Sequence, residues 1–466
     1  MLPWKIYEDD APYAVGSASC ALYHCAADNI IDDMDRYLAQ GCGGAANWTF
    51  SGPWWDHGAA TVANLTGFAF SAIRDANLTV DYWISDTEKG MSNWNIGSSA
   101  SDPCAILRWR AIESDPRWPS LLDELVAAGF EELPGQTRDV LLDTVATRAA
   151  SDNYLVWNAV MQHRVRRYYI SMWQPAVAVF PELQGSDYLG RYWSPSRPIP
   201  DKNGHRLMDY GQGSHFGTHQ AVPSYGGFNQ LENAVDLLVD GRYYMTPYRA
   251  FLYDLQIHRS QVLANPAVPV SPWICKKSWA GDAGYVRGVV NTSYWEENIV
   301  HMVLSGTSLF NYWNVPSEGE ASPDATRLNA LLSSTGALVE QYLGHTYSLG
   351  GRHNAGLTPM FTSLTNWSAP YVYTGMRGSN GACLWRFSVD TGQLDQASVL
   401  ISMANPVVFL IRATNETIVF RAAELVVNQP VIEAEAVGFM VSQAECATPE
   451  HRNCVESPGL CAAYFQ

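Results

Sequence analysis

Charged side chains are scarce in this chain of 466 residues. Asp, Glu, Lys and Arg make up 16% of it, whereas hydrophobic residues make up 47%. This balance indicates a compact globular protein and argues against disorder. Positive charge is the scarcer sign, because 29 Lys and Arg face 46 Asp and Glu, a formal net charge of −17. We therefore expect neither nucleic acid nor an acidic membrane surface as a partner, and a strongly polyanionic substrate is disfavoured.

Several targeting and catalytic motifs are missing. The first ten residues are polar and carry acids, so no signal peptide is visible, and a secreted protein would be represented here by a mature or shortened form. The longest apolar stretch, residues 397–413, is interrupted by Asn405 and Pro406, so we expect no transmembrane helix. No C-x-x-C pair supports a zinc site, no G-x-S-x-G elbow supports a serine hydrolase, and no Gly-rich loop follows an early strand. We expect no cofactor.

Cysteines and glycosylation sequons indicate an oxidising, extracellular environment. Nine cysteines are present, and three of them crowd into a Cys-rich tail at residues 446–466, which we expect to be held by disulfides. The odd number leaves at least one thiol unpaired, for which Cys275 is a candidate. Six N-x-[ST] sequons could carry N-glycans: Asn47, Asn64, Asn77, Asn291, Asn366 and Asn415. We therefore expect a secreted glycoprotein.

Aromatic residues are abundant, with 17 Trp and 24 Tyr, and many lie in pairs beside Gly, Pro and Ser. Some must be core residues. A surplus at loop positions is typical of proteins that stack aromatic rings on the apolar faces of sugars.

Residues 78–95 carry the most informative pattern. An apolar, β-branched and aromatic run ends at Ile84 and is followed by Asp86 and Glu88, with Trp94 shortly after. Alternation along an extended strand would put both acids on one side, where mutual repulsion raises at least one pKa and favours a proton donor. The alternative is that both acids are solvated turn residues.

Strands and helices alternate over some 300 residues. We predict helices at residues 59–75, 118–128, 137–167, 248–263, 294–304 and 324–343, and strands at 78–84, 168–180, 218–225, 267–275 and 307–313. This succession is typical of an α/β fold, a (β/α)8 TIM-like barrel, in which functional residues follow the carboxyl ends of strands. A doubly wound sheet is the alternative.

The pattern changes near residue 357. Short alternating runs at residues 371–373, 383–389, 397–403, 407–411 and 417–421 predict an all-β sandwich. We therefore divide the chain into a barrel domain at 1–356 with an N-terminal extension, a β-sandwich at 357–445, and the tail.

Further acids and aromatic residues are candidates for a sugar-cleaving site. Glu182 and Asp187 lie in the segment 181–188, which we predict to be a loop after a strand. Either of them, or Asp86, could partner Glu88, since glycoside hydrolysis needs two carboxylates. Candidate substrate-binding residues follow predicted strands or lie in loops: Trp94, Tyr188, His219, Gln220, Tyr225, Trp273, Lys276, Trp279, Tyr312 and Trp313.

Two other groups have simpler interpretations. His215, His219 and Asp209 could in principle bind a metal, but the surrounding glycines argue against the helix that the spacing would need, and we expect no metal site. Glu296 and Glu297 are expected at the start of a helix, where acids favour the helix dipole.

The strand end S-D-T-E at residues 85–88, with Trp94 after it and Y-W-N at 312–314, resembles the hyaluronidase- and chitinase-like glycoside hydrolases. The chain also resembles large secreted barrel proteins with a terminal β-domain, through G-T-H-Q at 217–220, S-P-W at 271–273 and L-W-R-F at 384–387. The first resemblance implies that Glu88 is the general acid and that Asp86 orients a substrate N-acetyl group. The chitinase pattern D-x-x-D-x-D-x-E is not met, so acid catalysis by Glu88 is the firmer of these two implications.

The sequence thus predicts a glycoside hydrolase that acts on a glycan or polysaccharide through carboxylates. The alternative is a non-catalytic carbohydrate-binding or structural extracellular glycoprotein on the same scaffold.

Overall fold

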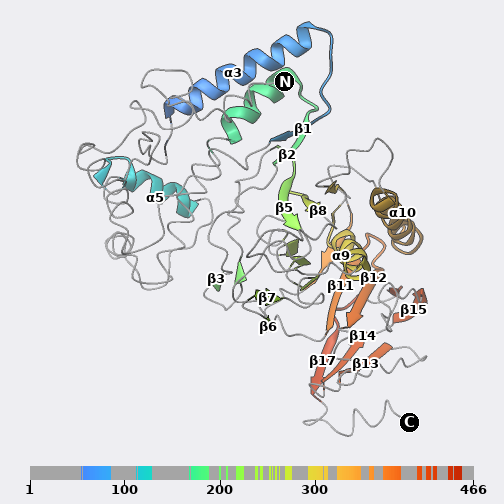
Figure 1. Cartoon of the computed structure of the whole chain (residues 1–466). Helices are drawn as coiled ribbons and strands as arrows, with labels where there is room; N and C mark the ends of the chain where they lie inside the picture. Colours follow the sequence, from blue (N-terminus) through green and yellow to red (C-terminus); the bar gives the residue numbers. More distant parts are fainter. Residues whose placement is uncertain are drawn as a thin grey trace, which may run out of the picture. The chain divides into compact units, whose positions relative to one another are not determined.

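The computed structural model describes about two fifths of the chain, in segments from residue 54 to residue 453 (Figure 1). The described residues are 54, 56–85, 112, 114–127, 167, 169–187, 199–200, 206–207, 217–224, 237–239, 242–244, 251–252, 254–255, 258–259, 262, 268–274, 292–307, 309–312, 323–347, 356–361, 371–389, 407–411, 416–420, 423–427, 439–443 and 446–453. Among them, no helix is both long and apolar enough to span a bilayer.

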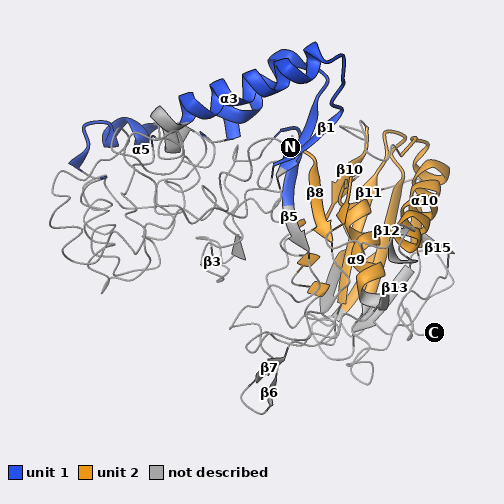
Figure 2. Ribbon diagram, turned by 45° about the horizontal axis from the view of Figure 1, so that its top comes forward, with its two compact units in different colours: residues 1–195, 209–221 blue, residues 196–208, 222–466 orange. Residues whose placement is uncertain are grey.

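The chain divides into two compact units, coloured separately in Figure 2. Unit 1 comprises residues 1–195 and 209–221, and unit 2 comprises residues 196–208 and 222–466. This division falls elsewhere than the boundary that we predict at residue 357.

Unit 1 contains α3 (Asp56–Asp75), α5 (Trp118–Ala127) and a further helix at residues 169–179. The predicted helices at 59–75 and 118–128 are thereby confirmed. Phe70 of α3, Ala176 and Leu183 form a small core with Trp83 and Trp173 packed against it. α3 packs close to the second helix at Gly67, where an added Cβ would be in ordinary contact with the Pro175 Cβ at 3.6 Å.

The predicted strand at 168–180 is wrong, because residues 169–179 form a helix. Its fully buried side chains are Tyr169, Met172 and Ala176, which recur at intervals of three and four residues, as on one face of a helix. The loop predicted at 181–188 is also wrong, since it contains β2 (Gln184–Asp187).

β1 (Tyr82–Ser85) pairs with β2 in parallel. The register sets Tyr82 opposite Gln184 and Ser85 opposite Asp187. β2 contains no apolar residue, so its pairing with β1, rather than its own propensity, makes it a strand.

The central elements of unit 2 are β8 (Val270–Ile274), α9 (Thr292–Leu304), β9 (Asn311–Tyr312) and α10 (Pro323–Leu343). β8 and β9 are parallel, and all three predicted helices in this region are helical where described. The predicted strand at 307–313 is shorter than expected.

Smaller strands complete the described part of the first 250 residues. They are β3 (Ile199–Pro200), β4 (Arg206–Leu207), β5 (Gln220–Ser224), β6 (Leu237–Val239) and β7 (Arg242–Tyr244). β3 pairs with β4, and β6 with β7, in antiparallel fashion.

The C-terminal part of unit 2 has two antiparallel sheets. The first has the order β10 (Thr358–Met360), β11 (Tyr371–Arg377), β12 (Cys383–Val389), β16 (Phe439–Ser442) and β15 (Ala423–Val427). The second consists of β13 (Val407–Ile411), β14 (Glu416–Phe420) and β17 (Glu450–Asn453). The strands predicted at 383–389 and 407–411 are confirmed.

Alternation along β11 and β12 builds two different interfaces. On one side, Tyr373, Trp385 and Phe387 surround Phe420 of the second sheet, with ring centroids 5.6–6.1 Å apart. On the other side, Met376 and Leu384 join the core formed by α9 and α10. This core crosses the boundary that we predict at residue 357, as the proximity of α9 to β11 and β12 in Figure 2 illustrates.

A disulfide joins Cys383 of β12 to Cys446, which lies 63 residues further along the chain. The first cysteine of the predicted tail is thus bonded to the sheet. The parallel pairs β1–β2 and β8–β9 are of the kind that a (β/α) barrel requires, while the complete barrel and the domain boundaries stay predictions.

Candidate functional site

The carboxyl ends of β1 and β2 are the first candidate site. Because the strands are parallel and Ser85 is opposite Asp187, both chains leave the sheet at the same edge. Asp86 and Glu88 follow Ser85 directly in the sequence, although both lie outside the described residues. Two chain segments that carry acids therefore emerge from neighbouring strands.

Glycine at position 185 permits close packing around β2. A Cβ on Gly185 would lie 2.7 Å from Cζ3 of Trp173 and 2.8 Å from the carbonyl oxygen of Trp83. Gly217 has a φ of +75°, and a Cβ there would lie 2.6 Å from the Gly185 backbone. Larger residues would force these segments apart.

A short turn, residues 217–219, is bound to β2 by backbone hydrogen bonds. The amides of Thr218 and His219 both donate to the Gly185 carbonyl oxygen, at 2.9 and 3.0 Å. The Gly185 amide donates to the Thr218 hydroxyl at 3.2 Å, and that hydroxyl lies 2.9 Å from Nδ1 of His219.

These contacts favour one tautomer of His219. The Gly185 carbonyl already accepts two amide protons, and it is 3.5 Å from the Thr218 hydroxyl. The hydroxyl proton is therefore better donated to Nδ1, which leaves the ring proton on Nε2. His219 is fully buried, with its ring centroid 6.2 Å from that of Tyr82.

Glu182 lies away from this edge. It is exposed in the turn before β2, whereas Asp187 ends that strand. The three residue steps of β2 alone, from Gln184 to Asp187, span about 10 Å at about 3.3 Å per residue. Glu182 and Asp187 therefore do not follow a strand together, as the sequence had suggested.

The predicted substrate-binding residues that are described are mostly buried. His219 and Gln220 are 0% and 2% exposed, and Trp273 is 8% exposed. Tyr312 is half-buried beside Trp295, with ring centroids 6.5 Å apart. Contact of these residues with a substrate stays a prediction. Outside the described residues lie Trp94, Tyr188, Tyr225, Lys276, Trp279 and Trp313.

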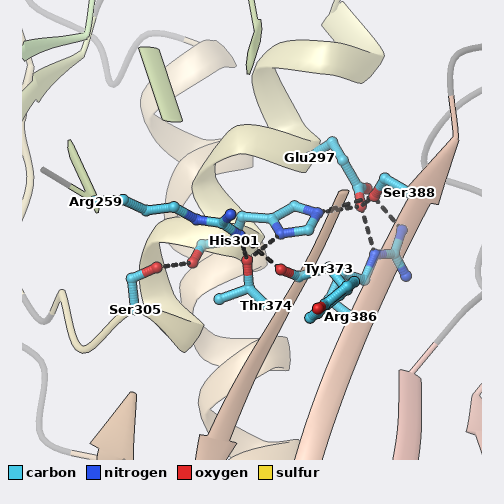
Figure 3. A network of polar contacts seen from close by, with 8 residues as sticks. All are labelled: Arg259, Glu297, His301, Ser305, Tyr373, Thr374, Arg386 and Ser388. Atoms are coloured by element: carbon cyan, nitrogen blue, oxygen red, sulfur yellow. Dashed lines mark hydrogen bonds and ion pairs between the residues drawn. The ribbon is translucent and has the colours of Figure 1, made fainter. Parts of the chain in front are cut away.

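A second polar centre lies within unit 2, where α9 meets β11 and β12 (Figure 3). Arg386 donates two hydrogen bonds of 2.6 Å to the two carboxylate oxygens of Glu297, and both side chains are fully buried. The Ser388 hydroxyl also donates to Glu297. From the sequence we expect Glu297 to interact with the helix dipole at the start of a helix. In the structure it forms a buried ion pair with Arg386 instead.

His301 lies one helical turn after Glu297 and continues the network. Its Nδ1 lies 2.6 Å from the Thr374 hydroxyl, and its Nε2 lies 2.9 Å from the Ser388 hydroxyl. Arg259 donates to the Thr374 hydroxyl and, at 2.7 Å, to the Tyr373 carbonyl oxygen.

The donors and acceptors follow one direction through this network. Arg259 donates to Thr374, which can donate to Nδ1 of His301, and Nε2 can donate to Ser388, which donates to Glu297. Neutral His301, with its proton on Nε2, therefore satisfies both of its hydroxyl partners. A second proton on Nδ1 would take the place of the proton that the Thr374 hydroxyl donates there.

The titration of these groups agrees with the contacts. Burial lowers the pKa of His301 to about 4, against the opposing effect of Glu297. Burial also lowers the pKa of His258 to about 3, with the charge of Arg259 adding to the effect. Burial alone would raise the pKa of Glu297, but the charge of Arg386 and hydrogen bonds from His301 and Arg386 hold that pKa below its usual range.

This network is closed to a substrate, because Glu297, His301, Arg386 and Ser388 are all fully buried. We interpret it as a structural link between α9 and the sheet. The sequence indicates this network only weakly. Arg386 and Ser388 are two positions apart in an otherwise apolar strand, so both lie on one face of it, and that face is polar although the strand is apolar overall.

Elsewhere in the described residues, no three His, Cys, Asp or Glu side chains are grouped so that they could hold a metal ion. His215 and Asp209 lie outside those residues.

Comparison with known proteins gives this chain no relative. No family model, no curated protein and no solved structure matches it.

Proposed function

We propose that this chain is a secreted glycoside hydrolase that cleaves a glycan or polysaccharide by carboxylate catalysis. The observation that carries the proposal is the parallel register of β1 and β2, with Ser85 opposite Asp187. It supports a site at which Glu88 donates a proton to the leaving oxygen and Asp187 acts as nucleophile or base.

The spacing of neighbouring strand ends is compatible with this pairing once the segment with Glu88 has left the strand, because continued alternation would put Glu88 on the face opposite to Asp187. Adjacent strands lie about 4.8 Å apart, and carboxyl groups on their ends suit the separation of about 5–5.5 Å in retaining enzymes or about 6.5–9.5 Å in inverting enzymes. Asp86 is the alternative partner and could instead orient the substrate. Trp94 and Tyr188, which follow the two strands, are proposed sugar contacts.

The partner of Glu88 can be identified by substitution. We expect Asp187→Asn to abolish most hydrolysis of a polysaccharide panel and Glu182→Gln to leave it intact, because Glu182 precedes β2. Full activity of Asp187→Asn would contradict the assignment of Asp187.

The secreted location is part of the same proposal. It makes the six sequons candidate sites for N-glycans: Asn47, Asn64, Asn77, Asn291, Asn366 and Asn415. The Cys383–Cys446 disulfide supports an oxidising compartment.

A second candidate is a non-catalytic carbohydrate-binding or structural glycoprotein. It is favoured by the burial of His219, Gln220 and Trp273, which withdraws three predicted sugar contacts from the surface. Binding of a glycan without its hydrolysis would favour this candidate.

A further inference from the structure

The two sequons of unit 1 that are described differ in local structure. Asn64 lies within α3, and Asn77 lies in the turn that follows it. We propose that Asn77 carries an N-glycan and that Asn64 does not. The inference rests on the proposed passage through a secretory compartment and is independent of hydrolase activity.

Asn77 terminates α3 in a left-handed conformation, with a φ of 57°. Its amide donates to the carbonyl of Arg74 at 2.8 Å, and the Leu78 amide donates to the carbonyl of Ile73 at 3.1 Å. This is the Schellman arrangement, in which asparagine is one of the few residues that adopt the left-handed position easily. The turn is therefore fixed by backbone bonds.

The whole acceptor triplet is accessible. Asn77, Leu78 and Thr79 are all exposed, and Leu78 exposes 60% of its surface. Among the described residues, no hydrogen bond engages the side-chain amide of Asn77. Residues 78–80 are neither helix nor strand. No regular element therefore fixes the hydroxyl of Thr79 away from the amide that it must assist.

Asn64 lacks this arrangement although its own side chain is exposed. Thr66, the hydroxyl residue of its sequon, is only 9% exposed. Side chains two positions apart on a helix do not face each other, so the hydroxyl and the amide point in different directions. Helical structure forms in about a microsecond, whereas synthesis adds about 5–20 residues per second, so the helical placement of Asn64 and Thr66 can form while the chain is still being synthesised.

The modification is a glycosyl transfer from a polyprenyl-diphosphate-linked oligosaccharide. The Asn77 side-chain nitrogen attacks the anomeric carbon, and an N-glycosidic bond forms as the bond from that carbon to the diphosphate oxygen breaks. The nitrogen loses one proton to the transferase, and the polyprenyl diphosphate leaves with the bonding electron pair. No oxidant or reductant is needed.

The test uses the full chain, with a cleavable secretory signal, expressed in a eukaryotic cell that N-glycosylates. Release of glycans by an amidase in heavy-oxygen water marks each occupied asparagine as a heavy aspartate in peptide maps. We expect the label at Asn77 in most molecules and at Asn64 in few. Thr79→Ala should abolish the label at Asn77, and Thr79→Ser, which keeps the sequon, should retain it.

Both variants keep Asn77 in its left-handed conformation, and Thr79 is exposed, so we expect both to fold like the unaltered protein. Thermal unfolding of each variant checks this. An unlabelled Asn77, or equal labelling of Asn64 and Asn77, would overturn the proposal. Labelling at Asn77 in a protein without hydrolase activity would support this inference while contradicting the proposed enzyme.

Discussion

Ser85 and Asp187 are Cα partners at the carboxyl ends of two parallel strands. This relationship joins two segments that are about 100 residues apart in the sequence. Asp86 and Glu88 follow Ser85 in the sequence, so this pairing of strand ends is the geometric basis of the proposed hydrolase.

The packing of this edge depends on Gly185. Because an added Cβ would lie 2.7 Å from the Trp173 ring and 2.8 Å from the Trp83 carbonyl oxygen, we expect Gly185→Ala to lower the free energy of unfolding. The loss should be about 1–3 kcal/mol, as for other overpacked sites, and denaturant titration measures it. Gly67→Ala is the matched control: its Cβ would find ordinary contact at 3.6 Å within α3, so stability should be unchanged or raised. An equal loss in both variants would contradict the close approach at Gly185.

Thr218 should fix the tautomer of His219. In protein with ¹⁵N-labelled histidine, we expect long-range NMR correlations to show the His219 proton on Nε2. Thr218→Val removes the hydroxyl donor to Nδ1 and should let the other tautomer appear. A proton on Nδ1 in the unaltered protein would mean that the hydrogen-bond directions are reversed.

The ion pair of Glu297 and Arg386, in which both side chains are fully buried, should contribute far more to stability than the pair of Glu296 and Arg327, in which only Glu296 is buried. Glu297→Gln leaves Arg386 buried without its counter-charge, so we expect a loss of about 3–5 kcal/mol in the free energy of unfolding. Glu296→Gln is the control, because Glu296 pairs with Arg327, whose side chain is 52% exposed. That substitution should cost about 0–1 kcal/mol. Similar losses would contradict the structural role of the buried pair.

Acid should destabilise the protein between pH 6.5 and pH 4. Folded His258 and His301 have pKa values lowered to about 3 and about 4, so in this range the unfolded chain binds protons that the folded chain does not. Stability therefore falls as the pH decreases through the ordinary histidine range, by about 2 kcal/mol per histidine from pH 7 to pH 5.

Urea unfolding at several pH values measures this effect. Replacing either histidine with glutamine should reduce the pH dependence by roughly half, whatever it does to stability at pH 7. Below pH 4.5, Glu297 should add to the loss of stability. Its pKa is lowered in the folded protein, so the unfolded chain binds a proton there that the folded chain does not. A free energy of unfolding that stays constant from pH 7 to pH 5 would contradict neutral, buried histidines.

Much of the secondary structure is predictable from local patterns. The apolar periodicity of α3 and α10, the alternation in β12 and the continuous apolar run of β13 are strong enough to locate these elements. The helix at 169–179 was misassigned because its β-branched and aromatic residues outweighed the helical spacing of Tyr169, Met172 and Ala176.

The remaining features depend on contacts that are distant in the sequence. β2 has the sequence Q-G-S-D and becomes a strand through pairing with β1 and the space that Gly185 leaves for Trp173. Glu297 and Arg386 are 89 residues apart, so no local signal could pair them. The candidate acid Glu88 was selected by its position after a strand, and its environment lies outside the described residues.

The most direct test of the proposed function compares Glu88→Gln with the unaltered protein on a panel of polysaccharides, with Asp123→Asn on the exposed side of α5 as the control. General acid catalysis contributes about 10²–10⁴-fold, so we predict that Glu88→Gln lowers kcat/KM by at least about 100-fold on any glycan that the unaltered protein cleaves, while Asp123→Asn leaves it unchanged. Full activity of Glu88→Gln, or binding of a glycan that the unaltered protein never cleaves, would contradict the proposal.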